Sequence, residues 1–239
     1  MADFTITLGN KNYSSWSLRG WLPLKQSGAR FAERVIPLRQ PDTQARILAH
    51  SPSARVPALE VANGDADGPL VIWDSLAIAE YLAERFPAAG LWPSEPAARA
   101  LARALSAEMH AGFAALRTAM PMDLRRREPE LGARLRQAPG VADDIARIAA
   151  IWQDCRARFG SGGEFLFGPF CNADVAFAPV ASRFVTYGVP LPDLAAAYRD
   201  AILAWPAMLE WAAAAQAETW TIDFPERDRL AVARPARVE

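Results

Sequence analysis

Asn12-Tyr13-Ser14-Ser15-Trp16-Ser17-Leu18-Arg19 is the stretch that says most about how this chain folds. It comes directly after residues 4–8, where apolar residues alternate with threonines as in a half-buried strand. Ser14 or Ser15 can cap a helix that runs to residue 27, and Gly28 is a typical C-terminal stop. The stretch therefore predicts a strand, a short turn and a helix in close succession.

The hydroxyl groups at this helix start suit the binding of an anion. The first N–H groups of a helix have no partner within it, and the helix dipole is positive there. A thiolate is such an anion, and a hydroxyl that donates a hydrogen bond to it lowers the pKa of the thiol. Serine is also a common N-cap, so Ser14 and Ser15 have two interpretations, a cap or a contact to sulfur.

Short strands and helices alternate as far as residue 86. The patterns predict strands at 31–36, 57–61 and 70–73 and helices at 42–47 and 76–86. Turn residues at 63–68 join the last two strands. The order β-α-β-α-β-β-α predicts a small sheet with helices on both faces. Pro23 should kink or shorten the first helix.

Two further motifs lie where these elements begin. If the bond between Val56 and Pro57 is cis, Val56 turns its backbone N–H and C=O outward to pair with a peptide-like ligand; if it is trans, this is an ordinary strand entry. Asp74 and Ser75 open the helix after the last strand. They either cap that helix or bind an α-amino acid, with Ser75 on its carboxylate and Asp74 on its ammonium.

The pattern is almost wholly helical after residues 87–96, which we interpret as a linker between domains at 1–86 and 97–239. Helices are predicted at 96–120, 128–159 with a break at Pro139-Gly140, 172–187, 194–201 and 206–217, whereas the tail after Asp223 has little pattern. His110, Phe113 and Arg117 are spaced to share one face of the first helix. That face either looks into a substrate cleft or packs on another helix, with Arg117 in an ion pair.

The composition excludes several classes of protein. A net charge of −1 gives no field that would attract nucleic acid or an anionic membrane. Two cysteines, Cys155 and Cys171, are too few for a disulfide framework, and with only two histidines we expect no metal site. We see neither a signal peptide nor an apolar run long enough to cross a membrane, so we expect a cytoplasmic protein.

The three motifs together, in this order, resemble the glutathione transferase superfamily. The run Ser14-Ser15-Trp16-Ser17-Leu18-Arg19 is similar to the Ser-Ser-Cys-Ser-x-Arg motif of the zeta class, which includes maleylacetoacetate isomerases. Leu166-Phe167-Gly168-Pro169-Phe170-Cys171-Asn172-Ala173-Asp174 resembles the family's hydrophobic staple and capping box, with Cys171 where Ser or Thr is usual. The resemblance implies an α/β thioredoxin-like N-terminal domain and an all-α C-terminal domain.

The resemblance also implies roles for single residues. Ser14, or failing that Ser15, would contact the glutathione sulfur, and Val56 would pair with the cysteinyl backbone. Asp74 and Ser75 would hold the γ-glutamyl end, and Arg55 would clamp the glycyl carboxylate. His110, Phe113 and Arg117 would then face the second substrate.

We therefore expect a glutathione transferase that acts on a small electrophile, with glutathione as co-substrate and a homodimer as the family's usual state. Trp16 replaces the zeta-class cysteine, and no cysteine precedes Cys155, which argues against cysteine-dependent chemistry. One alternative is a glutathione-dependent cis–trans isomerase of a dicarboxylate, with Arg19 and Arg117 as its cationic groups. Another is a noncatalytic binding module on the same fold. The sequence does not name the electrophile.

Overall fold

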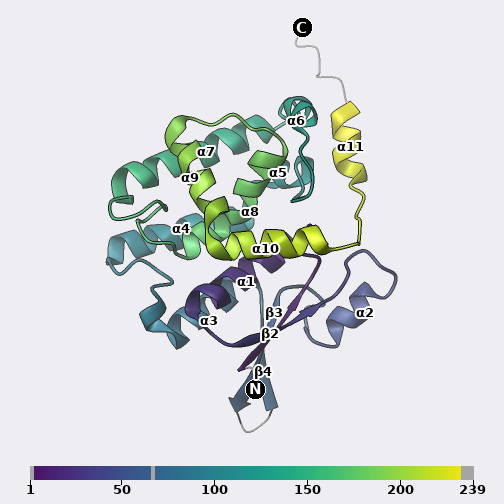
Figure 1. The fold of residues 1–239 in the computed structure, drawn as a ribbon, viewed down its shortest axis with the longest axis vertical. Helices are drawn as coiled ribbons and strands as arrows, with labels where there is room; N and C mark the ends of the chain where they lie inside the picture. The colour runs from purple at the N-terminus through teal and green to yellow at the C-terminus, as the bar shows by residue number, and fades with distance from the viewer. Residues whose placement is uncertain (1–2, 66–67, 233–239) are drawn as a thin grey trace.

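The computed structural model describes residues 3–65 and 68–232 and begins with a four-stranded sheet (Figure 1). Its strands are β1 (Phe4–Leu8), β2 (Phe31–Val35), β3 (Ala58–Asp65) and β4 (Gly68–Trp73), in the order β2-β1-β3-β4. β1 pairs parallel with β2 and antiparallel with β3, which pairs antiparallel with β4. Three helices alternate with the strands: α1 (Ser15–Ser27), α2 (Thr43–Leu48) and α3 (Ser75–Arg85). The predicted order β-α-β-α-β-β-α is confirmed.

Helix α1 has the predicted boundaries and is not shortened at Pro23. Ser14 is its N-cap, and Gly28 ends it with a left-handed φ of 72°. Pro23 removes one backbone hydrogen bond, yet the helix continues to Ser27. Every residue from 17 to 24 is buried against the rest of the molecule. The expectation that Pro23 shortens the helix is wrong because this packing outweighs the missing bond.

The described residues after α3 are mainly helical. After a short 3₁₀ helix, η1 (Pro87–Ala89), come α4 (Pro96–Ala111), α5 (Ala114–Ala119), α6 (Pro129–Leu135), α7 (Val141–Phe159), α8 (Asn172–Thr186), α9 (Asp193–Ala204), α10 (Pro206–Ala217) and α11 (Pro225–Val232). One prediction fails here. The helix expected at 96–120 breaks at Phe113, whose φ is 56°. In the tail after Asp223, where the sequence has little pattern, residues 225–232 form α11, which packs on α5 and α6 (Figure 1).

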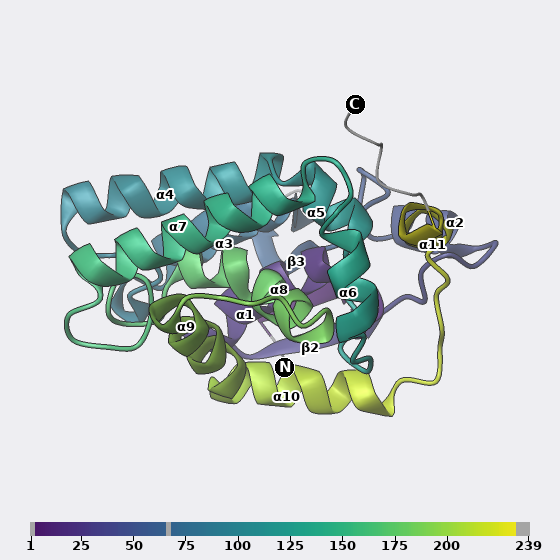
Figure 2. The ribbon, with the colours of Figure 1, turned by 90° about the horizontal axis from the view of Figure 1, so that it is seen from above.

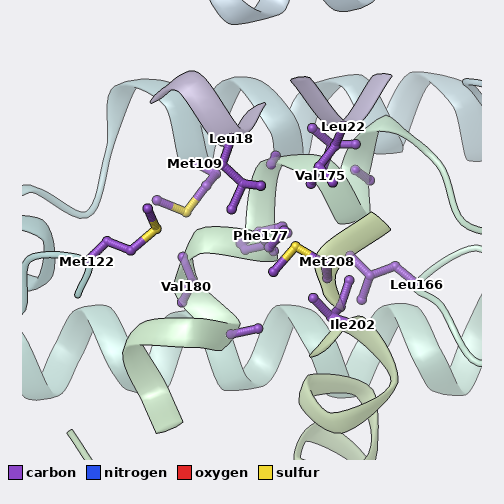
Figure 3. Close-up of a cluster of buried hydrophobic side chains, with 14 of the residues drawn as sticks. Leu18, Leu22, Met109, Met122, Leu166, Val175, Phe177, Val180, Ile202 and Met208 are labelled. Carbon is purple, nitrogen blue, oxygen red and sulfur yellow. The ribbon is translucent and has the colours of Figure 1, made fainter. Parts of the chain in front are cut away.

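The hydrophobic core centres on α8, which lies in the middle of the helices in Figure 2. It packs against α1, α4 and α9. Leu18 of α1, Met109 of α4 and Phe177 of α8 are fully buried there (Figure 3). Trp152 of α7 joins them, with its ring edge to face with that of Phe177. Because α1 packs directly on α8, the sheet-bearing half and the helical half share one core. Within the described residues, no helix combines the length and apolarity that a membrane span requires.

The start of α8 is held by a buried carboxylate. Asp174 is fully buried and accepts the N–H groups of Leu166 and Cys171, at 3.0 and 2.8 Å, and the hydroxyl of Tyr198, at 2.9 Å. Burial raises the pKa of Asp174 to about 6, despite these hydrogen bonds. Cys171 keeps the N-cap position, as the resemblance implied. The motif is therefore a folding element that ties the loop before α8 to its first turn.

Replacing Asp174 by alanine tests this cap. The change leaves two backbone N–H groups and one phenol hydroxyl without an acceptor. We therefore expect the free energy of unfolding to fall by about 3 kcal/mol. Tyr198→Phe removes only one of the donors and should lower it by about 1 kcal/mol. Urea denaturation followed by circular dichroism measures both, and equal losses in the two variants would contradict the capping role.

Candidate functional site

A cavity of about 350 Å³ opens where α1, β3 and α3 begin, and we call it the first cavity. Its lining residues come from the starts of α1 and α3, the loop that leads into β3, the end of β4 and the end of α4: Trp16, Ser53, Arg55, Val56, Pro57, Trp73, Asp74, Ser75 and His110. The structure thus brings together the four residues predicted to hold glutathione. His110, predicted to face the second substrate, joins them.

The start of β3 has the geometry that the sequence left open. The bond between Val56 and Pro57 is cis. The first residue of β3 in the ladder is Ala58, so the backbone of Val56 lies beyond the paired part of the sheet. Gly20 of α1 lies against Pro57 so closely that a Cβ on it would be 2.6 Å from the proline Cγ. A glycine at this position therefore lets α1 set the position of the Val56-Pro57 turn.

Asp74 caps α3 and also contacts His110. Its Oδ1 accepts the N–H of Leu76 at 2.8 Å, and its Oδ2 lies 3.3 Å from Nε2 of His110. Asp74 has a φ of 75°, an unusual backbone conformation that tends to occur at functional sites. Ser75 is buried, and its Oγ has no hydrogen-bond partner among the described residues. Ser75 therefore offers a free hydroxyl at a helix N-terminus, where a carboxylate binds well.

The two serines of the first motif have different partners. Oγ of Ser14 accepts the N–H of Ser17 at 3.2 Å and donates its proton to Oγ of Ser17 at 2.7 Å. Oγ of Ser15 instead accepts a hydrogen bond from Nη2 of Arg183 at 3.2 Å. No acceptor for the Ser15 proton lies among the residues that the structure describes. Ser14 is thus committed to capping α1, whereas the proton of Ser15 is available.

A second cavity, of about 240 Å³, also borders Trp16. It is lined by Ser15, Trp16, Ala114, Arg117, Thr118 and Arg183. Arg117 therefore reaches a cavity, as one interpretation of the sequence required. Phe113 does not: it is 7% exposed and packs in the core. The expectation that His110, Phe113 and Arg117 share one helix face is wrong, because the helix breaks between the first and the last of them.

Three guanidinium groups surround Trp16. Those of Arg19 and Arg117 lie 4.7 and 5.5 Å from the centre of its ring, and Arg183 donates to the neighbouring Ser15. Burial, together with the charges of Arg183 and Arg117, holds the pKa of Arg19 well below its usual value. Burial also lowers the pKa of Arg183 to about 10. The N-terminus of α1 therefore lies in a strongly positive environment.

The turn before α1 is held by residues of the helical half of the chain. The carboxylate of Glu218 accepts the N–H groups of Lys11 and Asn12, at 2.6 and 3.0 Å. The side-chain amide of Asn12 donates to Asp123 at 2.9 Å, and Arg125 donates to the hydroxyl of Tyr13 at 2.8 Å. We call this set of contacts the clamp. It fixes the backbone that leads into Ser14 and Ser15.

Sequence reasoning missed Trp73, Arg183 and the clamp. Arg183 did carry a signal, because a charged residue inside an otherwise apolar, buried helix requires a special partner. Trp73, which is 48% exposed at the end of β4, had no comparable signal. In the described part of the chain, no group of His, Cys, Asp and Glu side chains is arranged to hold a metal ion.

Comparison with known proteins decides the family. The glutathione S-transferase N-terminal domain matches residues 13–85. A Caenorhabditis elegans protein named "Probable maleylacetoacetate isomerase" is 32% identical over 184 residues, which cover 75% of this chain and 79% of that protein. The chain belongs to the glutathione S-transferase superfamily. Similarity to a maleylacetoacetate isomerase makes it a zeta-like member, as the first motif implied.

Two more comparisons cover the glutathione S-transferase fold more fully. Glutathione S-transferase GstB of Escherichia coli K12 is 28% identical over 212 residues, which cover 82% of this chain and 92% of GstB. The crystal structure of a Burkholderia glutathione transferase homologue with bound glutathione superposes with a TM-score of 0.64 at 25% identity. That superposition covers 90% of this chain and 99% of the homologue. The thioredoxin-like sheet and the helical C-terminal part together therefore form the glutathione transferase architecture.

Glu218→Ala tests the clamp. The substitution leaves the N–H groups of Lys11 and Asn12 without an acceptor, so we expect the free energy of unfolding to fall by about 2 kcal/mol. Hydrogen exchange at these two amides should become faster. Glu210→Ala is the matched control, because it removes only an exposed ion pair with Lys25 and should cost at most about 0.5 kcal/mol. Unchanged exchange at Lys11 and Asn12 would contradict the clamp.

Proposed function

We propose that this glutathione S-transferase binds glutathione in the first cavity and activates its thiol at the N-terminus of α1, with a serine hydroxyl as hydrogen-bond donor. The observation that carries the proposal is the meeting of Val56, Asp74 and Ser75 in one cavity beside that helix end. The Burkholderia homologue contains bound glutathione and aligns with nearly the whole chain, which supports glutathione as the co-substrate. The enzyme is a transferase that joins this thiol to an electrophile.

Each end of glutathione has a matching group in the first cavity. The backbone of Val56, free of the sheet, pairs with the cysteinyl residue as an added strand would. The free hydroxyl of Ser75 and the start of α3 bind the γ-glutamyl carboxylate, and Asp74 binds its ammonium group. Arg55, exposed at the rim, pairs with the glycyl carboxylate. His110 holds Asp74 in place for this contact.

Ser15 is the better candidate for the contact to sulfur, although the family motif pointed first to Ser14. The proton of Ser14 already goes to Ser17, whereas Ser15 accepts from Arg183 and keeps its own proton for a thiolate. The helix dipole and the nearby guanidinium groups favour the same anion. A fall of two units in the thiol pKa corresponds to about 2.7 kcal/mol, which these groups can together supply.

The reaction then follows from the positions of the two cavities. The thiolate forms near Ser15, and the electrophile lies in the second cavity, where it meets the sulfur beside Trp16. A carbon–sulfur bond forms as the leaving group departs with its electron pair. The enzyme contributes a high fraction of thiolate and a fixed orientation of the two reactants. We place it in the cytoplasm as a homodimer, in keeping with its family.

A dicarboxylate isomerase is the second candidate. The similarity to a maleylacetoacetate isomerase supports it, and so do the three arginines around Trp16. Trp16 argues against the isomerase, because an indole occupies the position of the zeta-class cysteine. The noncatalytic binding module has no such support, since the relatives that cover most of the chain are named as enzymes. Conversion of maleylacetoacetate at a rate above that of aromatic substitution would favour the isomerase.

The pKa of the bound thiol distinguishes the two serines. We expect the thiolate absorbance of bound glutathione to titrate well below that of free glutathione in the wild type, and to shift by one unit or more towards the free value in Ser15→Ala, because the hydroxyl donor is lost. Ser14→Ala should leave this pKa within about 0.5 unit while it lowers the free energy of unfolding by about 1 kcal/mol through the lost cap. A large shift in Ser14→Ala alone would return the role to Ser14.

Gly20 offers a test of the glutathione cavity that changes no binding residue. A methyl group in Gly20→Ala would push Pro57 away and displace the backbone of Val56. We expect about tenfold weaker glutathione binding by titration calorimetry. Gly28→Ala is the control, because its φ of 72° makes alanine unfavourable there but nothing lies within 4 Å of the new methyl group. Equal losses of affinity in both variants would point to a general loss of stability instead.

A further inference from the structure

A small inner pocket adjoins the first cavity, because Ser75 and His110 line both of them. Its walls come from α1, α3, α4 and α8, and they include Arg19 and Asn172. Its volume of about 10 Å³ has room for one water molecule. Helices from both halves of the molecule therefore meet at a space the size of a single small molecule, next to the glutathione cavity.

Polar atoms without partners converge on this inner pocket. Arg19 is 4% exposed and Asn172 is 3% exposed. In the described chain, both terminal nitrogens of Arg19, Oδ1 of Asn172 and Nδ1 of His110 are buried and have no hydrogen-bond partner. All three residues line the pocket. Buried polar atoms are nearly always hydrogen-bonded, so the pocket requires an occupant that pairs with all three.

The donors and acceptors around the pocket select water as that occupant. The nitrogens of Arg19 can only donate. The side-chain nitrogen of Asn172 contacts the carbonyl of Ala79 at 3.4 Å, which leaves Oδ1 as an acceptor. Nε2 of His110 lies 3.3 Å from the Asp74 carboxylate, which favours the proton on Nε2 and leaves Nδ1 as a second acceptor. A water molecule accepts from the arginine and donates to both acceptors, whereas an anion would repel them.

Arg19 is held so that its two terminal nitrogens remain for the pocket. Its Nε donates to the carbonyl of Ala176 at 2.8 Å, and its guanidinium group lies 4.7 Å from the ring centre of Trp16. Burial, with the like charges of Arg183 and Arg117, holds its pKa well below the usual value. Hydrogen bonds to a polarisable network spread part of this buried charge over the neighbouring groups.

We propose that the inner pocket holds one ordered water, which accepts from Arg19 and donates to Nδ1 of His110 and Oδ1 of Asn172. This inference rests on the proposed function, which gives Asp74 the ammonium group of glutathione. The water keeps the proton of His110 on Nε2, where it faces Asp74 and holds that carboxylate in place for the ligand. Arg19 and Asn172 do not line the first cavity. They are positioning residues for the γ-glutamyl end of glutathione.

The tautomer of His110 tests this network in the free enzyme. The chain has only two histidines, so nitrogen-15 NMR of the histidine-labelled protein resolves both rings, and His50→Asn assigns them. We expect a protonated Nε2 and an unprotonated Nδ1 on His110 in the wild type, and a mixture of tautomers in Arg19→Met and in Asn172→Ala. A single unchanged tautomer in both variants would overturn the network.

Gln26→Ala is the matched control for Asn172→Ala. Gln26 also carries an amide that donates to a backbone carbonyl, that of Phe170, but it does not line the inner pocket. We therefore expect Gln26→Ala to keep the wild-type tautomer of His110. A mixed tautomer in this control as well would trace the effect to general loosening of the helices and would contradict the network.

A ligand without the ammonium group tests the positioning role. The probes are S-methylglutathione and its desamino analogue, in which hydrogen replaces the amino group of the γ-glutamyl residue. We expect S-methylglutathione to bind about tenfold more weakly to Arg19→Met and about threefold more weakly to Asn172→Ala, while the affinity for the analogue changes little. Equal losses for both ligands, or tighter binding of S-methylglutathione, would overturn the role. If the wild type binds neither ligand, the proposed function fails, and the tautomer of His110 still tests the network.

A crystal structure distinguishes water from an anion in the inner pocket. We expect one ordered water within hydrogen-bond distance of Arg19, His110 and Asn172, and no anomalous signal there after a soak in sodium bromide. Bromide in the pocket, or direct contacts among the three side chains with no atom between them, would overturn the proposal.

Discussion

The clamp on the turn at residues 10–13 is the constraint on which the rest of the site depends. The N–H of Tyr13 is accepted within the turn by the carbonyl of Asn10, whereas the N–H groups of Lys11 and Asn12 are accepted by the carboxylate of Glu218. Asp123 and Arg125 hold the side chains of the same turn. Helix α1 begins directly after it, and Gly20 of that helix then positions the Val56-Pro57 turn. Residues of the helical half thus fix the turn that leads into α1, and the start of α1 borders both cavities.

Trp16 is the second organising feature, because it lines both cavities. Its ring contacts that of His110, at 4.9 Å between centres, and the guanidinium groups of Arg19 and Arg117. A cysteine at this position would leave these arginines without an aromatic face to rest on. The indole therefore supports two of the like charges near the start of α1. The residue that distinguishes this chain from the zeta motif also forms a wall that the two cavities share.

Most of the fold could be predicted because its signals are local. Strand alternation, the caps at Ser14 and Asp74 and the stop at Gly28 depend only on neighbouring residues. The break at Phe113 could not be predicted, since a bulky residue with positive φ is rare and is imposed by packing. Helix α11 carried no clear amphipathic pattern, and its place depends on contacts with α5 and α6. These failures mark the places where tertiary structure overrides local preference.

The candidate site likewise has a part that local sequence signals predict and a part that only tertiary structure determines. Arg55, Val56, Asp74 and Ser75 could be predicted together because each stands where an element begins at one edge of a small sheet. The choice between the two serines could not, because it depends on which hydroxyl already has a partner. The hydroxyl of Ser14 donates its proton to Ser17, three residues on. Arg183 of α8 donates to the hydroxyl of Ser15. A hydroxyl that accepts from a cation is polarised towards donation, so Arg183 favours donation by the hydroxyl of Ser15.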